Sequence, residues 1–498
     1  MRLAHDVETV RAAEEVLLAA LPEGALMDRA ATGLARTCAL LLEGVYGSRV
    51  VLLVGSGNNG GDALYAGAAL ARRGARVDAV LLSERAHEGG LTALRAAGGR
   101  VAGGGVEDLL EAADLVVDGI LGIGGRGGLR PEAAALVARA EASVATLVAV
   151  DVPSGVDAGT GEVAGAAVHA DVTVTFGTLK PGLVVDPGAS HAGVVELVDI
   201  GLGPHLLAHG APALGLLDPD EVAALLPAPG AESDKYRRGV LGVVAGSDAY
   251  TGAAVLTVGG ALRAGAGMVR YSGPDVPTGL VRARWPEVVV GEGRVQAWAA
   301  GPGLGTDDAA RARLEKVLLA DEPAVVDADG TTVLAALVRE RGPLASWTSR
   351  PVPLVLTPHA GELARLLDAA GSDAGRGEVE AARLACAREA AARYGAVVLL
   401  KGSTTVVAAP DGSVLVNDVA TPWLATAGSG DVLTGVVGAL LAGGVDPLDA
   451  AAAGAHLHGL AGRLAAHDED GTGVDGAPVT AEDVLAALPA ARRALRAG

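Results

Sequence analysis

The chain has 498 residues, too many for one ordinary hydrophobic core, which predicts two large domains. A formal net charge of −20 would repel a phosphate backbone, so nucleic acid is not an expected partner. The longest apolar stretches, such as 432–445, are shorter than the roughly 20 residues that cross a bilayer, so no membrane partner is expected either.

The two cysteines, Cys38 and Cys386, fall in separate predicted domains without a Cys or His nearby at metal-ligand spacing. We expect both to be small buried side chains, with no disulfide framework and no structural zinc. The N-terminus shows no long apolar core of a signal peptide. These features predict a reducing, cytoplasmic location.

The first part of the chain alternates short apolar runs with alanine-rich stretches of helical period, which predicts a parallel α/β sheet. Ligands of doubly wound sheets bind at the carboxyl edge of the strands, and several of these runs end in glycine-rich or Asp-bearing turns. We therefore expect function in those turns. The expected strands are 50–54, 77–82, 115–117, 146–150 and 172–176.

The first turn runs from Gly55 to Asp62 and reads Gly-Ser-Gly-Asn-Asn-Gly-Gly-Asp, with an alanine-rich helix expected from Ala63. Its glycines fit the dinucleotide pattern G-x-G-x-x-G, a weak indication alone, and Glu84 lies where a ribose-binding carboxylate would be needed. The extra amides and carboxylate offer ligands for both anions and cations at a helix N-terminus.

Two further turns follow strands and should meet the first at one edge of the sheet. One runs from Asp118 to Gly128, and the other is Asp-Val-Pro-Ser-Gly from Asp151 to Gly155. The alternative is that these are ordinary turns, in which Asp118 and Asp151 serve only as helix caps.

The three motifs, with 175–182 after them, resemble the NAD(P)HX epimerase family from about Leu26 onwards. Two departures are Ser56 in place of the usual Pro and Ala63 in place of a usual Gly. The resemblance implies that Asp151 is the acid/base group, which moves a proton as the C6 carbinol centre opens and recloses.

The same resemblance implies a potassium ion held by Asn59, Asp118 and Ser154, whose oxygen atoms suit a hard cation. The hydrated nucleotide would be bound by Asp151 and by residues of the first two turns, namely Asn58, Asn59, Gly60, Gly61, Asp62, Gly122, Ile123, Gly124, Gly125, Arg126, Gly127 and Gly128.

The periodicity lapses over 205–217, and a new helix is expected to begin at Asp218 with Pro219 in its first turn. We place the domain boundary between residues 212 and 213. The alternation then restarts and ends in a helix-rich region from Asp431 onwards. The expected strands of this second domain are 240–244, 268–271, 324–326, 353–356 and 396–400.

The sequence Ala-Gly-Ser-Gly-Asp at 427–431 precedes the apolar helix 432–441, so its free amides could bind a transferring phosphate. Asp431 would stand beside that phosphate and accept a proton from a hydroxyl nucleophile. The chain has no Walker A motif. Lys-Gly-Ser-Thr-Thr at 401–405 supplies one cation and three hydroxyls that could serve adenosine phosphates.

These motifs are joined by polar or glycine-rich turns at 250–254, 301–305, 327–329 and 357–362. Over about 234–488 the set resembles the ADP-dependent NAD(P)HX dehydratase family, a branch of the ribokinase-like fold. A departure at 330–332, Gly-Thr-Thr in place of Ala-Leu-Asn, leaves the contacts of that loop open.

The second resemblance implies dehydration of S-NAD(P)HX to NAD(P)H, with ADP giving AMP and phosphate and with Mg²⁺ as the metal. Asp431 would deprotonate the C6 hydroxyl. The hydrated nucleotide would contact Ala253, Gly303, His359 and Asp431, and the adenosine phosphate would contact Lys401, Gly402, Ser403, Thr404, Thr405 and Gly430. Taken alone, His359 could be a hydrogen-bonded loop histidine, Lys401 an exposed strand-end lysine and Asp431 a helix cap.

The chain as a whole thus resembles a bifunctional NAD(P)H-hydrate repair enzyme, both isomerase and lyase. We expect a Rossmann-like three-layer domain over 1–212 and a ribokinase-like α/β domain over 213–498, in a homo-oligomer that acts on NADHX, NADPHX and ADP. The alternatives are a vitamin or sugar kinase fused to a Rossmann-like oxidoreductase, and a non-catalytic nucleotide-binding regulator. A regulator would not need both Asp151 and Asp431.

Overall fold

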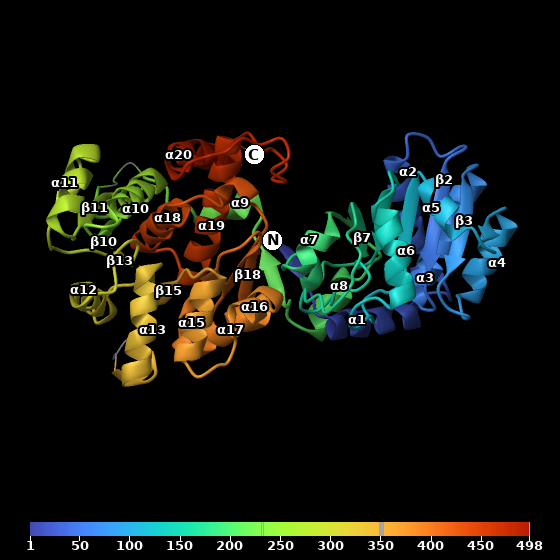
Figure 1. Ribbon diagram of the computed structural model, residues 1–498, viewed down its shortest axis with the longest axis horizontal. Coiled ribbons are helices and arrows are strands. Elements are labelled where there is room, and N and C mark those ends of the chain that lie inside the picture. Colours follow the sequence, from blue (N-terminus) through green and yellow to red (C-terminus); the bar gives the residue numbers. More distant parts are fainter. Residues whose placement is uncertain (231, 233, 348–352, 498) are drawn as a thin grey trace. The chain divides into compact units, whose positions relative to one another are not determined.

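The computed structural model describes residues 1–230, 232, 234–347 and 353–497, in two compact units. One unit is Leu3–Leu214, and the other joins Met1–Arg2 to Gly215–Gly498. Both are built on mainly parallel sheets with helices around them, so the predicted α/β fold class is confirmed (Figure 1). Within the described ranges, no helix combines the length and apolar character needed to span a bilayer.

The unit Leu3–Leu214 contains a seven-stranded parallel sheet in the order β4-β3-β2-β5-β6-β7-β8. The chain enters at β2, moves outward through β3 to β4, and then returns to place β5 on the other side of β2. This reversal is a topological switch point, where ligands of doubly wound sheets bind. The strands are β2 (Arg49–Val54), β3 (Arg76–Leu81), β4 (Arg100–Val101), β5 (Leu115–Gly119), β6 (Thr146–Val150), β7 (Val172–Phe176) and β8 (Val194–Val198).

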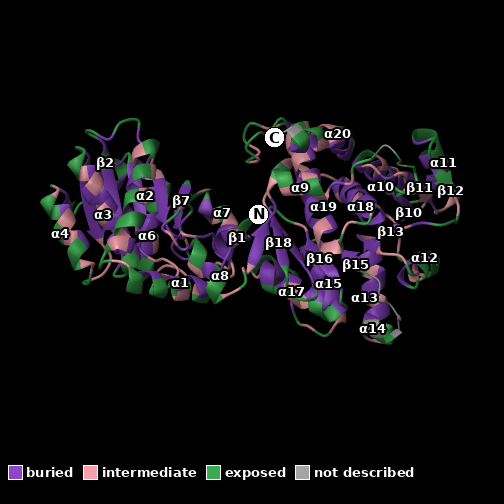
Figure 2. Cartoon of the chain, turned by 180° about the vertical axis from the view of Figure 1, so that it is seen from behind, coloured by how far each residue is buried: buried purple, intermediate pink, exposed green. Residues whose placement is uncertain are grey.

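Helices cover both faces of this sheet and make the predicted three layers. Alternate residues of β2 face opposite cores: Leu52 packs in one cluster and Leu53 in the other, as the two-residue period of a strand requires. Figure 2 shows the strands buried between partly exposed helices. The helices are α1 (Val7–Ala20), α2 (Ala25–Leu41), α3 (Asn58–Arg72), α4 (Glu88–Ala96), α5 (Val106–Glu111), α6 (Pro131–Glu141), α7 (Gly188–Ala192) and α8 (Gly203–His209).

Helix α3 begins at Asn58, earlier than the predicted start at Ala63, so the residues 58–62 form its first turn rather than a loop. Gly57 is the extended N-cap residue, with φ −94° and ψ −170°. A Cβ on Gly60 would lie 2.3 Å from the carbonyl oxygen of Gly55, so the helix can start this close to β2 only because Gly60 has no side chain.

The passage 205–217 is also more regular than predicted, since it contains most of α8 and the strand β9 (Leu214–Leu216). Neither β8 nor β9 was predicted from the sequence. The helix predicted from Asp218 is confirmed as α9 (Pro219–Leu225), where Asp218 and Glu221 form a capping box.

The second unit contains an eleven-stranded sheet in the order β1-β9-β18-β17-β16-β15-β14-β13-β10-β11-β12. The pairs β16–β17 and β17–β18 are antiparallel, and the pairs from β15 to β12 are parallel. Besides β9, its strands are β1 (Arg2–Ala4), β10 (Val240–Val244), β11 (Met268–Tyr271), β12 (Val289–Val290), β13 (Ala297–Ala300), β14 (Ala324–Val326), β15 (Leu354–Leu356), β16 (Val397–Leu400), β17 (Thr405–Ala408) and β18 (Val414–Asn417).

All five strands predicted for this unit are present, whereas β12, β13, β17 and β18 were not predicted. The helix-rich end is confirmed as α18 (Ser429–Ala442), α19 (Pro447–Ala466) and α20 (Ala481–Ala497). The other helices are α10 (Thr251–Ala264), α11 (Asp275–Arg284), α12 (Asp308–Leu318), α13 (Asp329–Arg341), α14 (Leu344–Trp347), α15 (Ala360–Ala369), α16 (Arg376–Ala381) and α17 (Arg383–Tyr394).

Helices α10 and α18 touch backbone to backbone through glycines. A Cβ on Gly260 would lie 2.3 Å from the carbonyl oxygen of Val432, and a Cβ on Gly435 would lie 2.1 Å from that of Thr257. This contact fixes α18, whose first turn carries Gly430 and Asp431.

We expect Gly435→Ala to lower the free energy of unfolding of this unit by about 1–3 kcal/mol, because the new methyl group has no room and the helices must separate. Gly279→Ala in α11 is the matched control, since no atom lies within 4 Å of its Cβ position. Alanine there should be neutral or stabilising by up to about 1 kcal/mol. Urea unfolding measures both, and equal losses would contradict the assignment of a glycine contact.

Candidate active sites

The first candidate site is a cavity of about 420 Å³ at the switch point of the first unit. Of the residues predicted to bind the hydrated nucleotide, it is lined by Asn58, Asn59, Asp62, Gly122, Ile123, Gly124, Gly125 and Asp151. The predicted residues Gly60, Gly61, Arg126, Gly127 and Gly128 do not line it. The lining also includes Ser56, Gly57, Ile120, Leu121 and Phe176, which lie within the predicted motifs, and Arg11 and Glu14, which the sequence analysis did not indicate.

Hydrogen bonds join the three predicted turns, which confirms that they converge. The amide nitrogen of Asn59 donates to the carbonyl oxygens of Leu121, at 2.9 Å, and Val150, at 2.8 Å. Ser154 donates to the carboxylate of Asp118 from its backbone N–H, at 2.9 Å, and from its hydroxyl, at 2.7 Å. Burial raises the pKa of Asp118 to about 6, although these hydrogen bonds act in the opposite direction.

Asp151 lies between the end of β6 and a buried lysine. Its φ of +67° is in the left-handed region, an unusual and strained conformation for an aspartate. Its Oδ1 accepts from the ammonium of Lys180 at 2.6 Å and from the hydroxyl of Thr175 at 3.3 Å. Lys180, 1% exposed, also donates to Thr175 and to the carbonyl oxygen of Phe176.

Lys180 is a site residue that the sequence analysis missed. It stands inside the motif 175–182, but nothing local indicates that its side chain reaches the turn after β6. The only available indication is its rarity, because the chain contains four lysines.

Two more carboxyl groups border the same cavity. Asp62, in the first turn of α3, is 8% exposed, and its Oδ1 is buried without a hydrogen-bond partner. Burial, with the nearby charges of Asp151 and Glu14, raises its pKa to about 8. Burial and the charge of Asp151 also raise the pKa of Glu14, although Lys180 and Arg11 oppose this shift. The cavity therefore combines one ion-paired carboxylate with a carboxyl group that holds its proton at neutral pH.

The second candidate site is a cavity of about 620 Å³ in the other unit. It lies among the loop after β16, the loop after β18, and the helices α18 and α19. The predicted residues that line it are His359, Lys401, Gly402, Ser403, Thr405 and Gly430, whereas Ala253, Gly303, Thr404 and Asp431 do not. Ala253 and Gly303 instead meet each other, because a Cβ on Gly303 would lie 2.8 Å from that of Ala253.

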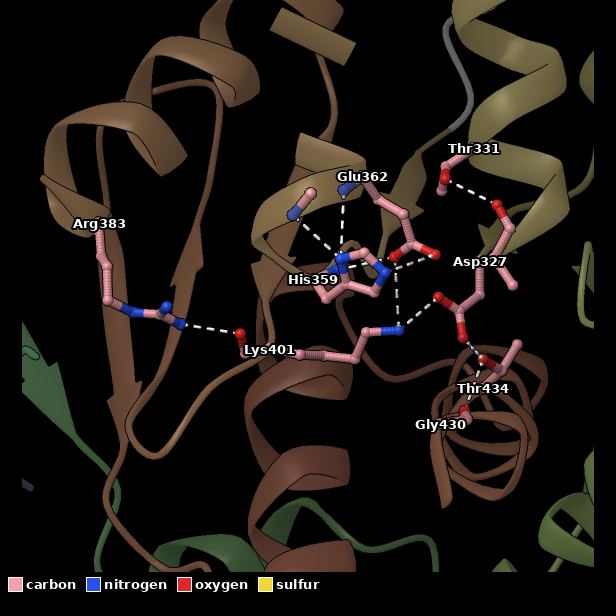
Figure 3. A network of polar contacts seen from close by, with 10 residues as sticks. Asp327, Thr331, His359, Glu362, Arg383, Lys401, Gly430 and Thr434 are labelled. Carbon is pink, nitrogen blue, oxygen red and sulfur yellow. Dashed lines mark hydrogen bonds and ion pairs between the residues drawn. The ribbon is translucent and has the colours of Figure 1, made fainter. Parts of the chain in front are cut away.

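Asp327, which directly follows β14, organises the polar network at this cavity (Figure 3). Its two carboxylate oxygens accept from the ammonium of Lys401 and from the hydroxyl of Thr434, each at 2.7 Å. The Lys401 ammonium is also 3.8 Å from the carboxylate of the buried Glu362. Burial acts to lower the pKa of Lys401, but the charges of Asp327 and Glu362 outweigh it and the pKa is raised. Lys401 is therefore a charged, largely buried group and not an exposed strand-end lysine.

Asp431 lies in the first turn of α18. Burial raises its pKa to about 7, with help from the charge of Asp327 and against the opposing charge of Lys401. A Cβ on the neighbouring Gly430 would lie 3.5 Å from the Lys401 ammonium. The carboxyl group thus changes its protonation near neutral pH, as an efficient general base must.

His359 is the N-cap residue of α15. Its Nδ1 accepts hydrogen bonds from the backbone N–H groups of Gly361, at 3.0 Å, and Glu362, at 3.2 Å. His359 is therefore hydrogen-bonded to its neighbours, as the structural alternative for this residue predicted. Its side chain is nevertheless 56% exposed and borders the cavity, so it remains accessible to a ligand.

Two unpredicted polar residues also line this cavity. Asn417, at the end of β18, and His458, in the middle of α19, each have a buried side-chain atom without a hydrogen-bond partner, Oδ1 and Nε2 respectively. Burial lowers the pKa of His458 to about 4, so its ring is neutral. No motif marks either residue, because each lies in a strand or helix that is otherwise apolar.

Family models match both parts of the chain. One described as NAD(P)H-hydrate dehydratase matches residues 241–481, and one described as YjeF-related protein N-terminus matches residues 23–182. The structure of the ADP/ATP-dependent NAD(P)H-hydrate dehydratase from Bacillus subtilis, co-crystallised with ATP/Mg²⁺, is 30% identical with a TM-score of 0.50. The match covers 57% of this chain and 99% of that one.

Full-length relatives are more similar still. The bifunctional NAD(P)H-hydrate repair enzyme Nnr of Mycobacterium tuberculosis is 50% identical over 462 residues, which cover 91% of this chain and 92% of that protein. The protein of the same name from Corynebacterium glutamicum is 36% identical, over 99% of this chain and 98% of its own. The resemblance found from the motifs is confirmed, and the chain belongs to the family of bifunctional NAD(P)H-hydrate repair enzymes.

Proposed function

We propose that this enzyme repairs hydrated NADH and NADPH in two successive steps. The first unit interconverts the R and S forms of NAD(P)HX, and the second dehydrates the S form with ADP, giving NAD(P)H, AMP and phosphate. The observation that carries the proposal is that each unit places a carboxyl group of the predicted type, Asp151 or Asp431, at the carboxyl edge of its sheet. A kinase fused to an oxidoreductase would not need the amide and carboxylate groups of the first turn of α3.

In the epimerase step, Asp151 takes the proton of the C6 hydroxyl and later returns it. The carboxylate is suited to this role because the Lys180 ammonium donates a hydrogen bond to it at 2.6 Å and so fixes its position. The hydrated nucleotide is bound by residues 58–62 and 122–128. Support for this comes from the free amides at the N-terminus of α3, which attract phosphate.

Potassium fits the group formed by Asn59, Asp118 and Ser154. All ligand atoms would be oxygens with one formal charge, which suits a hard monovalent cation better than zinc. The side-chain N–H groups of Asn59 donate to the carbonyl oxygens of Leu121 and Val150. These two oxygens carry partial negative charge, which favours a cation nearby. No group of three His, Cys, Asp or Glu side chains suited to a metal occurs in the parts of the chain that the structure describes. When bound, the cation would supply positive charge beside the substrate.

In the dehydratase step, Asp431 removes the proton of the C6 hydroxyl, whose oxygen then attacks the β-phosphate of ADP. The hydroxyl thereby becomes a phosphate ester, and loss of phosphate with the C5 proton restores the dihydropyridine. Ala253, Gly303 and His359 contact the hydrated nucleotide. Residues 401–405 and Gly430 hold the adenosine phosphate, with the charged Lys401 and the N-terminus of α18 as anion ligands.

Magnesium would be held mainly by the nucleotide phosphates, with one or two carboxylates of the protein. The residues fit this mode, because Asp327 and Glu362 lie within 4 Å of the Lys401 ammonium that we assign to the phosphates. The Bacillus subtilis relative, crystallised with ATP/Mg²⁺, supports the assignment. The metal would neutralise charge on the transferred phosphate.

We assign the enzyme to the cytoplasm, which the burial of both cysteines, one in each unit, supports. A homo-oligomer and a domain boundary between residues 212 and 213 stay predictions.

Asp431→Asn should lower the dehydration rate at least about 100-fold and leave epimerisation unchanged, whereas Asp151→Asn should do the reverse, since each removes one general base. Absorbance of reduced nicotinamide measures dehydration, and chromatography of the separated epimers measures epimerisation. Each variant is the control for the other. Loss of both activities from either folded variant would show that the two-site assignment is wrong.

The dehydration rate should rise with pH through about 7 and then level off. Burial raises the pKa of Asp431 to about 7, so below that pH its carboxyl group is protonated and cannot accept the hydroxyl proton. The turnover number with saturating ADP, measured from pH 5.5 to 9, tests this. A flat profile below pH 7 would rule out Asp431 as the base.

Replacing K⁺ by tetramethylammonium should slow epimerisation about 10-fold or more while dehydration continues, because only the first unit carries the proposed cation site. Ser154→Ala should raise the K⁺ concentration needed for half-maximal epimerisation. Epimerisation that proceeds equally fast without K⁺ would refute the site.

A further inference from the structure

The cavity of the first unit brings together two carboxyl groups in opposite surroundings. The Asp151 carboxylate has the ammonium of Lys180 2.6 Å away and the hydroxyl of Thr175 3.3 Å away. The same ammonium also donates to Thr175 and to the carbonyl oxygen of Phe176. Asp62 has no such partner for its Oδ1, although it is more than nine-tenths buried and borders the same cavity. The proposed function gives a role to the first of these groups only.

The surroundings of Asp62 favour its neutral form. A buried carboxylate without a cation or donor is costly, and the charges of Asp151 and Glu14 add to that cost. These effects, burial first, raise the pKa of Asp62 to about 8. The ionisable groups around the cavity are Glu14 and Arg11 on α1, Asp151, Lys180, and His87, whose ring lies against Gly61. Helix α3 itself also carries Tyr65, whose ring contacts His87, and Arg72 in its last turn.

We propose that Asp62 is the proton donor that acts opposite Asp151 in the epimerase half, and that Lys180 is the positioning residue that holds the Asp151 carboxylate in place as the acceptor. This inference rests on the proposed function. Two carboxyl groups whose surroundings separate their protonation states are the usual basis of paired acid and base catalysis.

The proposed step balances without any oxidant or added proton. The Asp151 carboxylate takes the proton of the C6 hydroxyl, the oxygen electrons form the C6 carbonyl, and the C6–N1 bond breaks. The electron pair left on N1 takes the proton of the Asp62 carboxyl group. Rotation about C5–C6 presents the other face of the aldehyde. In reclosure N1 attacks C6, its proton returns to Asp62, and the alkoxide recovers the proton of Asp151.

Glu14 is the natural competitor for the role of acid, since it borders the same cavity and has a raised pKa. It differs in two ways. Glu14 is less buried than Asp62, and Lys180 and Arg11 stabilise its charged form. Glu14→Gln is therefore the matched control for Asp62→Asn.

Asp62→Asn should lower the turnover number of epimerisation at least about 100-fold and change KM less than about threefold, because a positioned acid acts on the rate of the chemical step. Glu14→Gln should lower it less than about fivefold. Since Asp62 is neutral in this environment, asparagine removes no ion pair, and the variant should unfold at the wild-type temperature. Its dehydration activity reports the amount of intact enzyme.

The second measurement is the pH dependence of epimerisation. Wild-type epimerisation should decline above about pH 8 as Asp62 loses its proton, and the residual activity of Asp62→Asn should lack this decline. Retention of both the wild-type turnover number and the alkaline decline in Asp62→Asn would overturn the proposal, as would a larger loss in Glu14→Gln. Absence of epimerisation from the wild-type protein would instead refute the proposed function.

Lys180→Met should lower the turnover number of epimerisation at least about 10-fold and change KM less than about threefold, because the Asp151 carboxylate then loses the ammonium that positions it. Lys180→Arg should restore most of the turnover at neutral pH. A purely structural lysine would change the amount of folded protein but not the turnover number per folded molecule, and that result would overturn its role. The double variant Lys180→Met/Asp151→Asn should be no slower than Asp151→Asn alone.

Discussion

Each unit of this enzyme buries a lysine ammonium against an aspartate at the carboxyl edge of its sheet. Lys180 meets Asp151 at 2.6 Å in one unit, and Lys401 meets Asp327 at 2.7 Å in the other. Such pairs add little net stability, because desolvation offsets their attraction, yet loss of one partner leaves an uncompensated buried charge. Each pair instead places one positive and one negative charge at a cavity. These two lysines are half of the four in the chain.

The sheets explain why these groups can meet at all. The strand order of the first unit reverses between β2 and β5, so the turns after β2, β5 and β6 face one crevice. Glycines then allow the backbone to close in: α3 starts at Asn58 because Gly60 can lie against Gly55, and the start of α18 is held by the glycine contact with α10. The same close approach directs helix N-terminal amides at both cavities.

Strain is concentrated where the chemistry is proposed. Among the described residues, only three that are not glycine have a positive φ, and two of them, Asp151 and Ala328, adjoin the candidate sites. Ala328 follows Asp327, so this left-handed residue lies beside the carboxylate that binds Lys401. In both units a left-handed residue is, or directly follows, the aspartate that contacts a lysine, and the surrounding sheet and helices must offset the cost of this conformation.

The sequence by itself determined the family and the α/β class and predicted the two carboxylates, because each motif is a short run of residues after a strand and its residue types are visible locally. It misplaced the start of α3, since close packing of Gly60 against Gly55 is not a local property. Only the tertiary structure joined Lys180 to Asp151, 29 residues away, and Asp327 to Thr434, 107 residues away. Only the tertiary structure shows that the Oδ1 of Asp62 is buried without a hydrogen-bond partner. The protonation of this carboxyl group depends on burial and on charges that are distant in sequence.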